Sequence, residues 1–191
     1  MSMDSEDGIL KAPKRLPVII LADVSLSMTA ALGEKTRIQA LNDGIERLIA
    51  KCKEIPSPQA EINIMVITFG AGVAELALAM TPIADANWRA VAANGNTPLG
   101  EALQLANRLM ASPTIISRRD YRPIVIISSD GGPNDEWTGP LAEFDASAAG
   151  AKADRFAVAI GADDDQAKGV LNRFLEPALK SKEASARLFT A

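Results

Sequence analysis

The sequence contains no histidine and only one cysteine, Cys52. Without histidine, the chain cannot form a Ser-His-Asp or Cys-His nucleophilic centre, and it has no imidazole ligand for a metal. A single cysteine excludes a disulfide within the chain and favours a reducing compartment, so we expect a cytoplasmic protein.

Long apolar runs and a strongly basic composition are also missing. No apolar run approaches the ~20 residues that a membrane span needs, and the acidic first seven residues lack the pattern of a signal peptide. The net charge is −4, and nothing in the sequence resembles the basic footprint of a nucleic-acid-binding protein. We therefore expect neither a membrane nor a nucleic acid as a partner.

The apolar content is sufficient for one well-packed domain. The chain has 191 residues, of which 48% are apolar, and this is enough for a substantial core. Residues 1–15 are polar and show no periodic pattern, so we interpret them as a flexible leader. Residues 16–191 then form a single domain.

Strand and helix patterns alternate along this domain. Thr36 and Gln39 have the spacing of a capping box, and Pro98 suits the first position of a second helix. The predicted strands span 18–21, 62–69, 73–80, 124–127, 156–160 and 187–190, and the predicted helices begin at 36, 98, 138 and 165, with the third reaching 152 and the fourth 174.

This order predicts an α/β fold with an open, doubly wound, mostly parallel sheet of about six strands and helices on both faces. The strands at 62–69 and 73–80 form a hairpin, which adds one antiparallel edge strand. Between this hairpin and Pro98 we expect irregular chain with a short helical turn near Trp88. Cys52 falls on the apolar face of the first helix, which predicts a core position.

The most informative segment is Asp23-Val24-Ser25-Leu26-Ser27, which follows the apolar run 18–21. It places a carboxylate and two hydroxyls at alternate positions where a strand passes into a loop. Such hard ligands suit Mg²⁺, with Mn²⁺ and Ca²⁺ as alternatives. Thr97 and Asp130 follow later, and Asp130 comes directly after the apolar strand 124–127 and two serines.

In an open parallel sheet, ligands bind beyond the carboxyl ends of the strands. If the strands before Asp23 and Asp130 are neighbours, both carboxylates reach one crevice, and they would offset the charge of one divalent cation. Each piece also has a plain structural explanation. Asp and Ser bond their own backbone in turns, Thr97 is a good N-cap, and Asp130-Gly131 is ordinary turn chemistry.

The ordered set Asp23-x-Ser25-x-Ser27, Thr97 and Asp130 resembles the metal-ion-dependent adhesion site, or MIDAS, of von Willebrand factor A domains. The segments 95–103 and 129–137 further resemble the bacterial tellurite-resistance TerY-type group. Leu26 departs from the pattern, because a glycine usually stands between the two serines.

That resemblance implies a fold and a function. The hydroxyls of Ser25, Ser27 and Thr97 would bind the metal, and Asp23 and Asp130 would bind it directly or through water. A partner protein would complete the coordination with an Asp or Glu carboxylate. The resemblance implies an interaction module rather than an enzyme, in a tellurite-resistance or stress-response system with kinase- and phosphatase-like partners.

Two other functions stay open at this point. A carboxylate and Mg²⁺ at a strand end also suit a phosphoryl-transfer enzyme. Against this, no second carboxylate stands two residues after Asp23, and the sequence has no Gly-x-x-x-x-Gly-Lys phosphate loop. The other alternative is a structural scaffold that binds no metal.

Overall fold

The computed structural model describes residues 13–56, 60–161, 165–176 and 187–191. Its centre is a six-stranded sheet in the order β5-β4-β1-β6-β7-β8. Only β5 runs antiparallel, against β4, and the other pairs are parallel. The strands are β1 (Lys14–Asp23), β4 (Ala60–Gly70), β5 (Val73–Pro82), β6 (Ile124–Ser129), β7 (Asp154–Ala159) and β8 (Leu188–Thr190). The predicted fold class, with its antiparallel edge strand, is confirmed.

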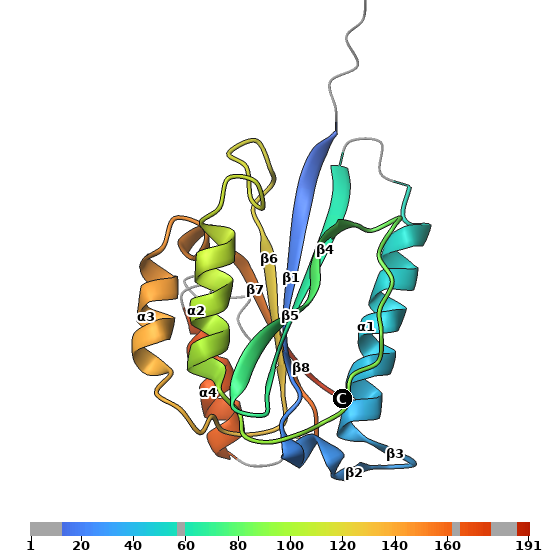
Figure 1. Cartoon of the computed structure of the whole chain (residues 1–191), viewed down its shortest axis with the longest axis vertical. Helices are drawn as coiled ribbons and strands as arrows, with labels where there is room; N and C mark the ends of the chain where they lie inside the picture. Colours follow the sequence, from blue (N-terminus) through green and yellow to red (C-terminus); the bar gives the residue numbers. More distant parts are fainter. Residues whose placement is uncertain (1–12, 57–59, 162–164, 177–186) are drawn as a thin grey trace, which may run out of the picture.

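Helices cover both faces of this sheet (Figure 1). On one face lies α1 (Arg37–Glu54), and on the other lie α2 (Leu99–Met110), α3 (Thr138–Ala146) and α4 (Asp165–Leu175). None of the helices in the described part of the chain is long and apolar enough to cross a membrane.

The central strand β1 contributes to the cores on both faces. Ile19 and Leu21 pack with residues of α2, α3 and α4, whereas Ile20 and Ala22 pack with residues of α1. Successive side chains of a strand point to opposite faces, so a central parallel strand needs an unbroken apolar run. This run therefore fixes β1 in the middle of the sheet, and its carboxyl end lies between those of β4 and β6.

The first helix begins as predicted. The Oγ1 of Thr36 accepts a hydrogen bond from the Gln39 N–H, and the Gln39 side chain accepts one from the Thr36 N–H. This capping box satisfies backbone donors that the first turn leaves free.

The third helix is shorter than predicted. We expected it to reach residue 152, but α3 ends at Ala146 and a single 3-10 turn, η2 (Gly150–Lys152), follows. The Ser147 Oγ donates to the Phe144 carbonyl and accepts from the Gly150 N–H. Serine side chains compete for backbone partners in this way, and here the competition ends the helix.

Other predictions also need correction. The first strand starts at Lys14, inside the predicted leader, and residues 1–12 of that leader lie outside the described residues. The segment near Trp88 is irregular, with a turn only at 83–85. Cys52 is half-buried rather than in the core. The loop after Ser27 also contains an unpredicted pair of short strands, β2 (Ala31–Leu32) and β3 (Lys35–Thr36).

Candidate metal centre

The candidate site lies where β1 and β6 end side by side. These strands are parallel neighbours, so their carboxyl ends meet at one edge of the sheet. Asp23 is the last residue of β1, and Asp130 directly follows β6. Both carboxylates are almost fully buried. The sheet therefore brings together two acidic residues that are far apart in the sequence, as the apolar strands predicted.

Both oxygens of Asp23 accept hydrogen bonds. The Ser25 N–H donates to Oδ1 at 2.9 Å, and the Ser129 Oγ donates to Oδ2 at 2.5 Å. Burial raises the pKa of Asp23 above its ordinary value, and the charge of Asp130 adds to the rise, while hydrogen bonds from Ser129 and Ser25 oppose it. Within the described part of the chain, no cationic side chain pairs with Asp23.

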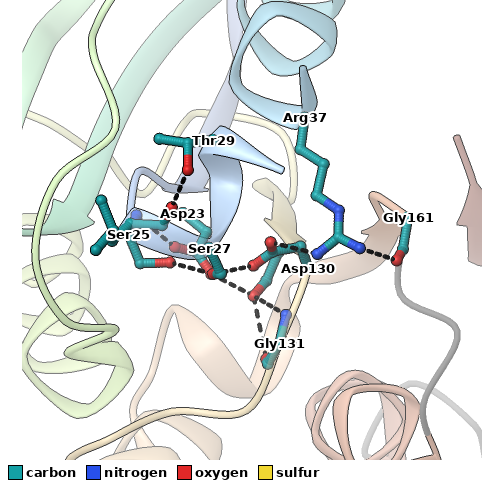
Figure 2. A network of polar contacts seen from close by, with 10 residues as sticks. Asp23, Ser25, Ser27, Thr29, Arg37, Asp130, Gly131 and Gly161 are labelled. Atoms are coloured by element: carbon teal, nitrogen blue, oxygen red, sulfur yellow. Dashed lines mark hydrogen bonds and ion pairs between the residues drawn. The ribbon is translucent and has the colours of Figure 1, made fainter. Parts of the chain in front are cut away.

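Two serine hydroxyls connect the end of β1 to Asp130 (Figure 2). They belong to the start of a 3-10 turn, η1 (Leu26–Thr29), for which Ser25 is the N-cap residue. The Ser27 Oγ donates to Asp130 Oδ1 at 2.8 Å, and it lies 2.9 Å from the Ser25 Oγ. Because the Ser27 proton points to Asp130, Ser25 is the donor between the two hydroxyls.

The plain turn explanation accounts for only part of this arrangement. Asp23 does bond the local backbone through the Ser25 N–H. The Ser25 side chain, however, makes no capping hydrogen bond to η1. The Ser25 and Ser27 hydroxyls are instead directed to each other and to Asp130.

Thr97 lies on a separate loop that is anchored beside β1. The Asn94 N–H donates to the Val24 carbonyl at 2.7 Å, and the Leu26 N–H donates to the Gly95 carbonyl at 2.9 Å. Gly95 has a φ of +65°, and a Cβ on it would lie 2.3 Å from the Ala71 Cα. Only glycine fits such an approach, so the loop can lie against the ends of β1 and β4.

The Thr97 backbone is also held from the other side. The Thr97 N–H donates to the Asn134 Oδ1 at 2.9 Å, and the Asn134 N–H donates to the Thr97 carbonyl at 3.1 Å. Pro98, not Thr97, is the N-cap residue of α2, and the Glu101 N–H in the first turn donates to the Asp135 carboxylate at 3.1 Å. The plain N-cap explanation of Thr97 is therefore wrong. Hydrogen bonds join the other four predicted residues, whereas Thr97 is buried on the adjoining loop.

Three further residues belong to this arrangement, and sequence reasoning missed their roles. Ser129 supports Asp23, and Asn134 supports Thr97. Arg37 donates from Nη1 to Asp130 Oδ2 at 2.8 Å and from Nη2 to the Gly161 carbonyl at 2.8 Å (Figure 2). Ser129 could have been found from its position before Asp130. Arg37 gave no signal, because it comes from a helix start far away in the sequence.

The donor set fits one hard divalent cation. It offers two carboxylates and three hydroxyls, which are the oxygen ligands that Mg²⁺, Mn²⁺ and Ca²⁺ accept. In the described residues, no group of three or more His, Cys, Asp or Glu side chains could hold a metal ion. A cation at the end of β1 would thus depend on the serine and threonine hydroxyls.

Solved structures resemble this chain in fold. The ArnB paralog VWA2 from Sulfolobus acidocaldarius has a TM-score of 0.63 at 13% identity, covering 93% of this chain and 41% of that one. Mussel byssus proximal thread matrix protein 1, with a zinc-occupied MIDAS motif, has a TM-score of 0.60 at 18% identity. The match covers 94% of this chain and 41% of the mussel protein. The SpRpn10 VWA domain has a TM-score of 0.60 at 15% identity, and the match covers 92% of this chain and 86% of that domain.

This chain thus spans less than half the length of the first two of these proteins. No curated protein sequence matches it at a significant level. A family profile described as von Willebrand factor type A domain matches residues 18–133, which is more than half of the chain. That region contains all five predicted site residues. The chain belongs to the von Willebrand factor type A domain family.

Proposed function

We propose that this domain binds one divalent cation, Mg²⁺ in the first place, and captures a partner protein through it. The observation that carries the proposal is the hydrogen-bonded series of Ser25, Ser27 and Asp130 beside the buried Asp23. These oxygens converge at the carboxyl edge of the sheet, where open α/β folds bind their ligands. The mussel protein whose MIDAS motif holds zinc supports a divalent cation in this family.

Each residue has a defined part in this proposal. Ser25, Ser27 and Thr97 would hold the cation through hydroxyl oxygens, each of which keeps a lone pair after its hydrogen bonds. Asp23 and Asp130 would balance the charge, directly or through water. When bound, the cation supplies an electrophilic position that attracts a carboxylate from the partner.

The surface beside this site favours contact with a protein. Leu26 stands between two of the proposed ligands, and 59% of its surface is exposed. An apolar side chain there would be covered when a partner docks, which would remove apolar area from water. We therefore propose a partner that presents an Asp or Glu next to apolar residues.

A binding role is better supported than phosphoryl transfer. Asp130 is engaged by Ser27 and Arg37, and Asp23 by Ser25 and Ser129. Both carboxylates are also buried, so a substrate would have little access to them for proton transfer. We propose that the domain is not an enzyme.

The biological setting that we propose rests on the resemblance of segments 95–103 and 129–137 to the TerY-type group. From this resemblance we propose a tellurite-resistance or stress-response system, and from the single cysteine we propose a cytoplasmic location. Kinase- or phosphatase-like proteins of that system are the first partners to test.

Calorimetry with Mg²⁺ and Mn²⁺, combined with capture of these candidate partners with and without EDTA, tests the proposal. Asp23→Ala and Ser27→Ala should lose metal binding, and partner capture should fall to the level seen in EDTA. Asp43→Asn, at an exposed carboxylate on α1, is the control and should behave as the wild type. Equal partner capture by Asp23→Ala with and without chelator would refute the mechanism.

A further inference from the structure

We infer that Arg37 is a resident counter-ion of the metal centre, which holds Asp130 in place without a cation and weakens the binding of a divalent one. The inference rests on the proposed metal binding and adds a residue that opposes it. It starts from the ion pair between Arg37 Nη1 and Asp130 Oδ2, at 2.8 Å.

The ion pair is well shielded from water. The Asp130 side chain is fully buried, and the Arg37 side chain is 22% exposed. A buried carboxylate needs a positive partner or several hydrogen bonds. Asp130 has a positive partner in Arg37 and accepts a further hydrogen bond from the Ser27 hydroxyl. Arg37 thus occupies the electrostatic role that a bound cation would otherwise have at this carboxylate.

The guanidinium is held in place by its surroundings. Its Nη2 donates to the Gly161 carbonyl at 2.8 Å, which leaves Nη1 directed at Asp130 (Figure 2). Gly161 has a φ of +57°, and a Cβ on it would lie 2.8 Å from the Arg37 Nε. The chain therefore has a glycine where any side chain would push the guanidinium away.

The position of Arg37 on its own helix offers no other explanation. Arg37 is the first residue of α1, and a cation at a helix N-terminus is disfavoured by the helix dipole. The first turn of α1 also has no acidic residue that could pair with it. Asp130 is thus the group that stabilises a positive charge at this point.

The charges of the site give the direction of the effect. Asp23 and Asp130 carry two negative charges, and Arg37 reduces the formal total to −1. A divalent cation at the two serines would lie near this guanidinium and be repelled by it. A repulsion of only ~1.4 kcal/mol lowers affinity about tenfold.

The test compares Arg37→Gln and Arg37→Lys with the wild type by calorimetry with Mg²⁺ and Mn²⁺, and by thermal unfolding in EDTA and in Mg²⁺. Arg37→Gln should bind both ions about tenfold more tightly. In EDTA it should melt at a lower temperature than the wild type, and Mg²⁺ should raise that temperature more. Arg37→Lys keeps the charge and should stay within about threefold of the wild-type affinity.

Arg47→Gln is the matched control for net charge. Arg47 is exposed on the same helix, ten residues or ~15 Å further along, and its loss should leave metal affinity within about twofold.

Three results would overturn the inference. The first is Arg37→Gln binding no tighter than the wild type, which leaves the proposed function standing. The second is Arg37→Gln that fails to fold even in Mg²⁺, because a cation in the site should replace the guanidinium. The third is the absence of metal binding by every variant and by the wild type, which would remove the proposed function as well.

Discussion

The hydroxyl of Ser129 donates a 2.5 Å hydrogen bond to the carboxylate of Asp23, joining the ends of β6 and β1. Both residues are buried, and no cationic group among the described residues pairs with Asp23. Ser129 therefore fixes one of the two carboxylates that we expect to balance the charge of the cation, although it is not itself a predicted ligand. Groups that orient a metal ligand from behind in this way affect metal affinity strongly.

Ser129→Ala should therefore weaken Mg²⁺ binding about tenfold. The metal-free protein should also lose about 1–3 kcal/mol of stability, because a buried acceptor loses its donor. Calorimetry measures the first effect and urea unfolding the second. Ser112→Ala, at a hydroxyl that pairs with Thr114 at the end of α2, is the control. Wild-type values for Ser129→Ala would show that Asp23 needs no support from β6.

Asn134 should matter for metal binding more than for folding. Its side chain and backbone form two hydrogen bonds with the backbone of Thr97, and the residue is exposed. Asn134→Ala should cost no more than ~1 kcal/mol of stability, yet lower Mg²⁺ affinity several-fold because Thr97 loses one of its two hydrogen bonds to Asn134. Asn96→Ala, at an exposed amide beside Thr97, should change neither quantity. Equal effects of both substitutions would argue against a specific role of Asn134.

Two glycines with nearly the same backbone conformation should respond differently to alanine. Gly33 has a φ of +60° and Gly161 a φ of +57°, so each Ala variant should lose about 1–2 kcal/mol from backbone strain. A Cβ at Gly33 meets nothing within 4 Å, whereas one at Gly161 meets the Arg37 guanidinium. Gly161→Ala should therefore cost more, and urea unfolding of both variants gives the difference. Equal costs would mean that Arg37 moves aside freely.

Arg155 is a buried polar link outside the candidate metal centre. It is 1% exposed and lies 4.8 Å and 5.2 Å from the ring centroids of Phe144 and Phe174. Its guanidinium donates to Asp145 at 2.6 Å and to the carbonyls of Phe174 and Gly150, both at 3.0 Å. These contacts join β7 to α3, η2 and α4.

Arg155→Met should therefore lower the free energy of unfolding by about 3–5 kcal/mol, because it leaves buried acceptors without a donor. Arg173→Met is the comparison, since Arg173 also contacts Asp145 but is 40% exposed. Its loss should cost less than ~1 kcal/mol. Urea denaturation of both variants measures the two changes in the free energy of unfolding. A small decrease for Arg155→Met would mean that water reaches the acceptors that the guanidinium leaves.

The sequence predicted the fold well because its signals are local. The unbroken apolar runs of β1 and β6 are what buried parallel strands require, and Thr36 with Gln39 marks the start of α1. The end of α3 was missed because it depends on the Ser147 hydroxyl, which forms hydrogen bonds with the backbone of Phe144 and Gly150 instead of with solvent. Whether a serine side chain bonds the backbone in this way depends on the packing around the helix, which the periodicity of the sequence does not show.

The candidate site was predictable in part for the same reason. Asp23 and Asp130 follow apolar strands, so their convergence could be inferred once those strands were taken as neighbours. The ion pair of Arg37 with Asp130 could not be inferred. It depends on how the start of α1 lies across the end of β6, and on a glycine at position 161 that leaves room for the guanidinium.

The sheet also separates the two tryptophans of the chain. Trp88 packs against the core on the α1 side and donates from Nε1 to Asn42 at 3.0 Å, whereas Trp137 packs against the core on the other side. Each layer of the molecule thus contains its own intrinsic fluorophore. Replacing Trp88 by phenylalanine would leave the indole signal of Trp137 alone, on the α2–α3 side and seven positions after Asp130. Ligand-induced changes on the two sides could then be recorded independently.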